Sequence, residues 1–270
     1  IGAIDGTLIP IRTPFKNEHL YVCHKGFHAI NVMATCNARL LFTNVVAKWH
    51  GSTHDSAVLD ASLLNIHLES GGLEKVGFLG QGYALTPTMM TPFHPDKMTS
   101  NAERKYQKAH TKTRNVIERS FGVLKQRFRC LDFCGGAMQF NPSRCCKIIL
   151  ATTVLHNMCI TDNTPLPETE GPFEGDDDHQ EICHEPPSTR SGVTVRQKLI
   201  CDDSHSVVKV KNPIPPTRRP TRRSTHHRHT TDASANTLPT RWSTRILTRY
   251  RNSYFFQLEA RTTSYGTTKT

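Results

Sequence analysis

Apolar side chains in the first fifty residues are spaced as they are in β-strands. Residues 1–11 are apolar and β-branched around an Asp-Gly pair, residues 26–35 alternate apolar with polar positions, and residues 40–49 are again apolar. Strict alternation over four to eight residues is typical of a half-buried strand. The turn-forming residues 37–39 lie between the second and third segments. We therefore expect three strands, the last two joined as a hairpin.

Helical spacing dominates the residues that follow. A helix is predicted over residues 55–68, with Ser52 or Thr53 as its capping residue. Residues 101–128 carry apolar side chains at i, i+4, i+7 and i+11, the pattern of a long helix with one face in the core. This stripe consists of Ile117, Phe121, Leu124 and Phe128. Asn141 is followed by proline and begins a last predicted helix.

A short apolar segment and a loop separate the two groups of helices. Residues 75–79 predict a buried strand, and the prolines that come after it mark a loop. Three meandering strands, a helix, a short strand and further helices follow the order of an RNase H-like α/β domain. The fold class that we expect is therefore α/β, with a mixed sheet flanked by helices.

Composition divides the chain into three zones. Residues 1–161 hold the strong periodicity and form the predicted domain. Residues 162–203 are acidic and proline-rich and read as a linker, with one patch near residues 193–200 that can form a helix. Residues 204–270 are rich in Thr, Arg, Ser and His, and we expect this tail to be disordered.

The positive charge belongs to the tail. The net charge is +11, and residues 204–270 contain 13 Lys and Arg against two acidic residues. The other 203 residues hold 21 basic and 21 acidic side chains and are neutral. Basic segments of this kind are typical of nucleic-acid-binding or nuclear-import patches, whereas a solubilising arm is the alternative interpretation.

Cysteine usage and hydropathy indicate a cellular compartment with reduced thiols. The nine cysteines are an odd number, and the chain begins without a basic stretch followed by an apolar one. We therefore expect free thiols in a cytosolic or nuclear protein. No run of 18 apolar residues predicts a membrane span. The chain starts at Ile1, inside a predicted strand, which suggests a fragment of a longer protein.

Three carboxylates are candidates for binding a metal ion. Asp5 interrupts an apolar strand, where an unpaired charge is costly, although an Asp-Gly turn that ends the strand is the alternative. Glu118 adjoins the apolar stripe of the long helix, but it could equally form a salt bridge with Arg114 or Arg119. Asp55 lies in the first turn of a predicted helix, where it also favours the helix dipole.

Seven segments, which follow one another across about residues 1–160, carry a resemblance to a known family: residues 2–11, 25–31, 51–56, 90–93, 109–114, 117–128 and 155–159. Together they resemble the DDE endonuclease domain of Harbinger transposases and of the nucleases derived from them. It implies an RNase H-like nuclease that hydrolyses DNA phosphodiester bonds with Mg²⁺ or Mn²⁺. Such chemistry uses a carboxylate cluster around two hard cations.

The resemblance assigns Asp5 as the first metal-binding acid and Glu118 as the last. The middle acid of the family falls in a Gly-Asp-Ser-Gly-Tyr-like turn. Here that turn is one residue shorter and has Gln81 at the place of the Asp. A glutamine offers a neutral carbonyl oxygen in place of a charge, so the metal site is expected to be impaired. Asp55 is kept as a tentative further ligand.

Departures from the family pattern leave two functions open. Leu8, Asn37 and His50 stand where the family usually has His, Asp and Pro. The chain is therefore interpreted as an impaired DNA endonuclease or, alternatively, as an inactive DNA- or protein-binding module. A translated pseudogene is a third interpretation, which the well-kept periodicity through residue 160 argues against for the domain.

Charge and resemblance together give the expected partners. The basic residues near the long helix that we expect to contact DNA phosphates are Arg114, Arg119, Lys125 and Arg127. Target recognition in the family is expected from an upstream helical region or from a separate DNA-binding partner protein. The resemblance and the basic tail together favour the nucleus as the location.

Overall fold

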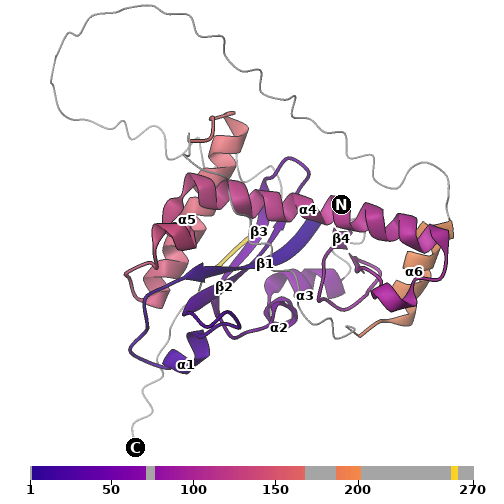
Figure 1. Cartoon of the computed structure of the whole chain (residues 1–270), viewed down its shortest axis with the longest axis horizontal. Helices are drawn as coiled ribbons and strands as arrows, with labels where there is room; N and C mark the ends of the chain where they lie inside the picture. The colour runs from indigo at the N-terminus through magenta and orange to yellow at the C-terminus, as the bar shows by residue number, and fades with distance from the viewer. Residues whose placement is uncertain (1, 71–76, 168–186, 202–256, 261–270) are drawn as a thin grey trace, which may run out of the picture.

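The computed structural model describes residues 2–70, 77–167, 187–201 and 257–260, and a six-stranded sheet lies at its centre (Figure 1). Its strands are β1 (Gly2–Pro10), β2 (Ala29–Cys36), β3 (Phe42–His50), β4 (Phe78–Leu79), β5 (Met89–Met90) and β6 (Gln257–Ala260). They are ordered β5-β4-β1-β2-β3-β6. The β1–β2 and β2–β3 pairs are antiparallel, and the other pairs are parallel. The predicted mixed sheet is confirmed.

Helices cover both faces of the sheet. They are α1 (Glu18–Tyr21), α2 (Asp55–Asp60), α3 (Leu63–Glu69), η1 (Pro95–Lys97), α4 (Asn101–Arg127), η2 (Arg129–Leu131), η3 (Phe133–Gly135), α5 (Pro142–Thr161) and α6 (Arg190–Cys201). Figure 1 shows α4 running across one face with α5 beside it, while α2 and α3 lie on the other. This helix–sheet–helix layering is that of the α/β class predicted from the sequence.

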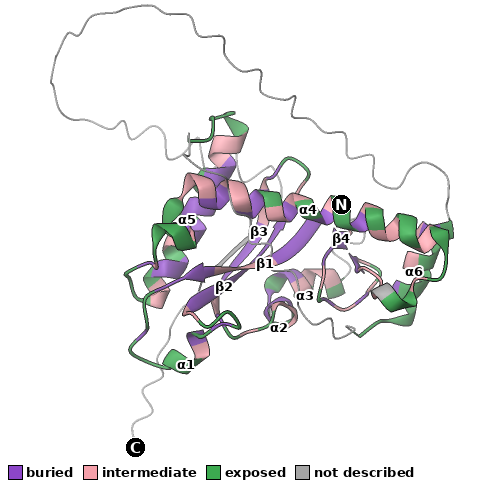
Figure 2. Ribbon diagram, viewed as in Figure 1, coloured by how far each residue is buried: buried purple, intermediate pink, exposed green. Residues whose placement is uncertain are grey.

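Successive strand residues supply two separate cores. In β2, Val32 and Ala34 point into the core shared with α4 and α5, whereas Met33 between them points to α2 and α3. In β3, Val46 likewise faces α2, and Val45 faces the opposite side. Successive side chains of a strand point to opposite faces of the sheet, so a strand that is apolar at every position contributes to the cores on both faces. Figure 2 shows the sheet buried throughout its centre.

The helix predicted over residues 55–68 is two helices, α2 and α3. Ser62 divides them, because its hydroxyl accepts a hydrogen bond from the Asn65 backbone N–H (3.2 Å) and donates to the Leu59 carbonyl (2.7 Å). A serine that caps a new helix competes with continuation of the old one. The predicted caps were also wrong: His54 is the N-cap of α2, and the Ser52 hydroxyl donates instead to the Leu20 carbonyl (2.7 Å).

Helix α5 is fastened to the β2–β3 hairpin by two adjacent buried side chains. The Asn157 side chain accepts from the Phe42 backbone N–H (2.9 Å) and donates to its carbonyl (2.8 Å), as a neighbouring strand would. His156 donates through Nε2 to the carbonyl of Leu40 (2.9 Å). Asn157 thus satisfies the backbone of the first residue of β3, and His156 satisfies a carbonyl of the turn that precedes this strand.

The short helix predicted near residues 193–200 is confirmed as α6 and belongs to the folded domain. Its Val195 and Leu199 pack against Leu85 and Met90. The Leu85 N–H donates to the Pro187 carbonyl (3.0 Å), and the Thr189 N–H donates to the Leu85 carbonyl (2.9 Å). The C-terminal part of the predicted linker, residues 187–201, therefore packs on the domain.

The end of the chain contributes one strand that the sequence did not predict. Residues Gln257–Ala260 form β6 and pair in parallel with Asn44–Ala47 of β3. Most of the acidic linker and the rest of the tail predicted to be disordered lie outside the described residues. Within the described ranges, no helix is long and apolar enough to cross a membrane. Eight cysteines are described, and all of them are free thiols, as predicted; Cys183 lies outside the described residues.

Candidate functional site

Asp5 lies in the middle of β1 and is 8% exposed. The strand continues through Asp5 and Gly6 to Pro10, so the alternative interpretation of a turn that ends the strand is wrong. One carboxylate oxygen, Oδ1, accepts a hydrogen bond from the Gly6 backbone N–H (3.1 Å). The other, Oδ2, accepts from Nη1 of Arg114 (2.7 Å). A charge buried in the sheet thus has a cation as its direct partner.

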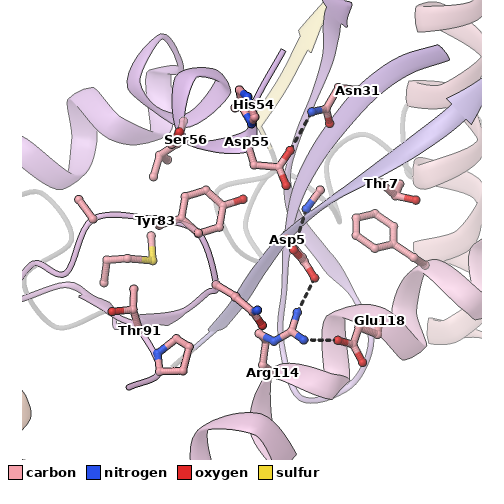
Figure 3. A pocket seen from close by; sticks show the side chains of 18 of the residues that line it. Asp5, Thr7, Asn31, His54, Asp55, Ser56, Tyr83, Thr91, Arg114 and Glu118 are labelled. Carbon is pink, nitrogen blue, oxygen red and sulfur yellow. Dashed lines mark hydrogen bonds and ion pairs between the residues drawn. The ribbon is translucent and has the colours of Figure 1, made fainter. Parts of the chain in front are cut away.

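Arg114 joins two carboxylates that lie 113 positions apart in the sequence. Its Nη1 binds Asp5, and its Nη2 lies 2.5 Å from Oε1 of Glu118, one helical turn further along α4. Figure 3 shows the guanidinium between the two acids. The Arg114 side chain is 7% exposed and that of Glu118 is 29% exposed, so the pair opens to solvent on the Glu118 side. The i,i+4 salt bridge that the sequence allowed is confirmed.

Asp55 flanks β1 from the side of α2. It is the first residue of that helix, and Nδ2 of Asn31 donates to its Oδ1 (2.8 Å). Its carboxylate touches Gly6 so closely that a Cβ atom on Gly6 would overlap with it. Only a glycine next to Asp5 permits this approach. The sequence placed Asp55 near the site as a tentative ligand, and the fold brings it against the residue that follows Asp5.

The environment of Asp5 favours its protonated form. Burial raises the pKa of Asp5 from 3.8 to about 7, and the neighbouring Asp55 carboxylate adds to the rise. The Arg114 guanidinium and the Gly6 N–H oppose it by stabilising the charged form. A carboxyl group with a pKa near 7 gains a large electrostatic benefit from a second cation, since that cation would offset the cost of burial.

Gln81 lies in the loop after β4 and lines the same groove as the three carboxylates. The groove has a volume of about 3000 Å³, and Asp5, Asp55, Gln81 and Glu118 all contribute to its wall. Gln81 is partly exposed, whereas Tyr83 two residues later is fully buried and anchors the loop. The position that the resemblance assigns to the middle acid therefore lines the same groove as Asp5 and Glu118, and the residue there carries no charge.

The donor atoms suit a divalent cation in kind but do not make a two-metal centre. Carboxylate oxygens are the ligands that Mg²⁺ and Mn²⁺ prefer. However, Arg114 holds Oδ2 of Asp5 and Oε1 of Glu118, and Gln81 is neutral. Among the described residues, no three His, Cys, Asp or Glu side chains are grouped as a metal site. In this arrangement the guanidinium lies between the two acids and contacts both (Figure 3).

The four basic residues that were expected to contact DNA have different surroundings. Arg114 and Lys125 are buried, at 6% and 7% exposure, and Arg114 is committed to the acids. The guanidinium of Arg127 donates to the carbonyls of Thr164 (2.6 Å) and Pro165 (3.0 Å). Arg119 is exposed and lines the groove. Of the four side chains it is the one that is exposed, and contact with DNA stays a prediction for all of them.

Residues 4–157 match the family described as DDE superfamily endonuclease. The matched residues include Asp5, Asp55, Gln81 and Glu118. The chain belongs to this family. Its members include proteins derived from Harbinger transposases, so the resemblance found in the sequence is confirmed. The DDE endonuclease superfamily generally uses divalent metal ions.

Curated relatives of this DDE endonuclease chain come from animals and plants. The mouse protein "Putative nuclease HARBI1" is 37% identical over 188 residues, which are 67% of this chain and 53% of the mouse protein. Its human counterpart is 37% identical over 161 residues, covering 59% and 46%. "Protein ALP1-like" of Arabidopsis thaliana is 24% identical over 227 residues, covering 77% and 51%. The chain spans about half the length of these relatives. No solved structure matches it.

Proposed function

We propose that this chain is a transposase-derived DNA endonuclease domain whose cleavage of phosphodiester bonds is impaired at Gln81. The observation that carries the proposal is the convergence of Asp5 from β1 and Glu118 from α4 on one open groove. Two acids held by one internal cation are a costly arrangement for a protein that needs only stability. Mg²⁺ or Mn²⁺ is the cofactor that these oxygen ligands fit.

Gln81 limits what the site can do. A pair of divalent cations is stabilised by the summed negative charge of the carboxylates around it. With Gln81 in the third position, the charged oxygen ligands that act on one another around Asp5 are the carboxylates of Asp55 and Glu118. The raised pKa of Asp5 weakens its charge further at neutral pH. We therefore expect slow or absent cutting by the natural chain.

A binding module without cleavage is the second candidate function. Arg114 forms an ion pair with each of the two acids without a metal, so these contacts across the site do not depend on a divalent cation. Such a module would bind DNA or a protein in the same groove, and its binding would not respond to Mg²⁺. This candidate and the nuclease differ in one measurable property, the dependence of cutting on metal.

The proposal also names DNA as the substrate, the nucleus as the location and a separate DNA-binding protein as a partner. A nuclease domain of this family acts on DNA, and the basic tail segment 218–229 is of the kind that serves nuclear import or phosphate contact. That segment lies outside the described residues. Target recognition would come from regions of a longer protein or from a DNA-binding partner, as the partial coverage of the relatives allows.

The test is metal-dependent nicking of supercoiled plasmid by the full chain. The natural protein is compared with a variant that carries Gln81→Asp with a serine inserted after it. A third protein carries the same change together with Asp5→Ala. We expect Mn²⁺-dependent nicking from the repaired variant alone. If the natural chain also cuts, and Asp5→Ala introduced alone into the natural chain abolishes that cutting, the enzyme works and the impairment is wrong. Silence from all three proteins, each shown to be folded by circular dichroism, leaves the binding module.

A further inference from the structure

Helix α4 carries a row of exposed basic side chains outside the groove. The row, which we call the α4 basic stripe, consists of Arg104, Lys105, Lys108, Lys112 and Arg119. All five are exposed, and Figure 2 shows exposed positions recurring along the outer side of α4. At 3.6 residues per turn they fall within about 100° of arc. The stripe therefore occupies one face of the helix, opposite the face that packs on the sheet.

No acidic side chain interrupts the stripe. The acids of α4 are Glu103 and Glu118, and both are used elsewhere. Glu103 accepts from the backbone N–H groups of Thr99 (2.7 Å) and Ser100 (2.8 Å) and so caps the helix. Glu118 binds Arg114. Residues 1–203 are electrically neutral as a whole, so this concentration of positive charge on one helix face is a local separation of charge.

The stripe leads into the groove. Arg119 belongs to both, since it is exposed on α4 and also lines the groove one residue beyond Glu118. Helix α6, which contacts α4, adds the exposed Arg190 and Lys198 and contains no Asp or Glu. A polyanion lying along α4 would thus extend from the region of α6 to the carboxylates of the site.

The geometry fits a nucleic-acid backbone better than a lipid surface. Arg104, Lys108 and Lys112 recur about every 6 Å, and the whole stripe is about 22 Å long. That length spans about six base pairs at 3.4 Å per pair. A helix that binds a lipid surface needs large apolar side chains beside its basic ones. The exposed positions between the basic residues are instead the polar Thr111 and Asn115.

We propose that the α4 basic stripe binds the phosphate backbone of duplex DNA and directs it toward Glu118. The inference rests on the proposed function for its substrate. It moves the backbone contacts from the buried Arg114 and Lys125 to Arg104, Lys108 and Lys112. Contacts of this kind supply affinity and register, and they carry no base specificity.

The test measures DNA affinity against salt without metal, by fluorescence anisotropy of the full chain with a 30-base-pair duplex in EDTA. The stripe variant combines Arg104→Gln, Lys108→Gln and Lys112→Gln. A control with the same net charge combines Arg12→Gln, Arg39→Gln and Lys147→Gln, three exposed residues on other elements. The stripe variant is expected to lose at least tenfold in affinity at low salt. Its slope of log Kd against log salt should fall by about 2 to 3, at about 0.9 per phosphate contact.

The difference between the two variants decides the matter, because the basic tail contributes equally to both. Equal affinities and slopes for the stripe variant and the control would overturn the proposal. A second measurement places a photo-crosslinking amino acid at Lys108 or at Lys147, and we expect DNA adducts from the first position only. Since binding is measured in EDTA, a stripe that binds DNA while even the variant repaired at Gln81 fails to cut would refute the nuclease and leave this inference standing.

Discussion

Replacing Arg114 with methionine removes the cation that Asp5 and Glu118 share. The methionine keeps most of the aliphatic length of the side chain, so the core around α4 stays filled. What changes is the charge: Asp5, at 8% exposure, loses its ion pair (2.7 Å). Glu118, whose side chain is 29% exposed, can recover part of its loss by binding water. The energetic effect therefore falls mainly on Asp5.

The pKa of Asp5 sets the size and the pH dependence of that effect. Burial raises the pKa from 3.8 in the unfolded chain to about 7 in the folded one, so folding favours the protonated form. The contribution of Asp5 to the free energy of unfolding is largest at low pH. It falls by about 4 kcal/mol in all as the pH rises from about 4 to 7. Removing Arg114 raises the pKa further. The variant is then less stable than the natural chain only at pH values at which Asp5 of the natural folded chain is ionised.

We expect Arg114→Met to lower the free energy of unfolding by about 2 kcal/mol at pH 8, of which the ionisation of Asp5 one pH unit above its pKa of about 7 supplies at most about 1.4 kcal/mol. At pH 5, where Asp5 is protonated in both folded proteins, the loss should be under about 1 kcal/mol. Urea unfolding followed by circular dichroism at the two pH values measures both. Arg119→Met, an exposed position on the same helix, is the control and should change stability by no more than about 0.5 kcal/mol. A loss for Arg114→Met that is the same at pH 8 and pH 5 would refute the reasoning.

Three further perturbations test other parts of the structure. Burial lowers the pKa of His110 and of His156 to about 4 from 6.5, so the folded chain loses about 2 kcal/mol per histidine between pH 6.5 and 5. Urea titrations should show that the free energy of unfolding of His156→Gln falls less than that of the natural chain between pH 6.5 and 5. An equal fall in the two proteins would exclude His156 as a source of the pH dependence. Asn157→Ala leaves the backbone N–H and carbonyl of Phe42 without their partner and should cost about 2–3 kcal/mol by the same assay, whereas a cost near zero would mean that water replaces the amide. Gly6→Ala forces a methyl group against Asp55 and should lower stability by about 1–3 kcal/mol, and a neutral result would place that carboxylate elsewhere.

The regular elements could be predicted from the sequence because each has a local period. The alternation in residues 26–35 and the stripe of Ile117, Phe121 and Leu124 reflect which face meets the core, and the structure confirms β2 and α4. The break at Ser62 was missed because the apolar spacing continues across it. A serine in such a position is also common inside uninterrupted helices, so the local pattern alone does not mark the cap.

Contacts between distant segments could not be predicted from any period. Arg114 was expected on the DNA side of α4, yet its helical position turns it toward β1, where Asp5 holds it. The sequence feature that did indicate a partner for Arg114 was Glu118, one helical turn later, because an i,i+4 spacing allows a salt bridge. Nothing near His156 and Asn157 in the sequence indicates that they bind the backbone of the β2–β3 hairpin, 116 and 115 positions away. The role of β6 at the edge of β3 likewise depends on distant pairing.

The fastening of α5 to the hairpin also gives the molecule a reporter of its own unfolding. The N–H of Phe42 is buried and held by the Asn157 side chain, and α5 shares its core with α4. Its exchange with solvent deuterium therefore requires α5 to leave the sheet, an opening that also dismantles the support of the site. The amides in the solvent-exposed first turns of α4 exchange through local fraying instead. Comparing the two rates with and without bound DNA would separate a ligand that orders one helix face from one that stabilises the whole domain.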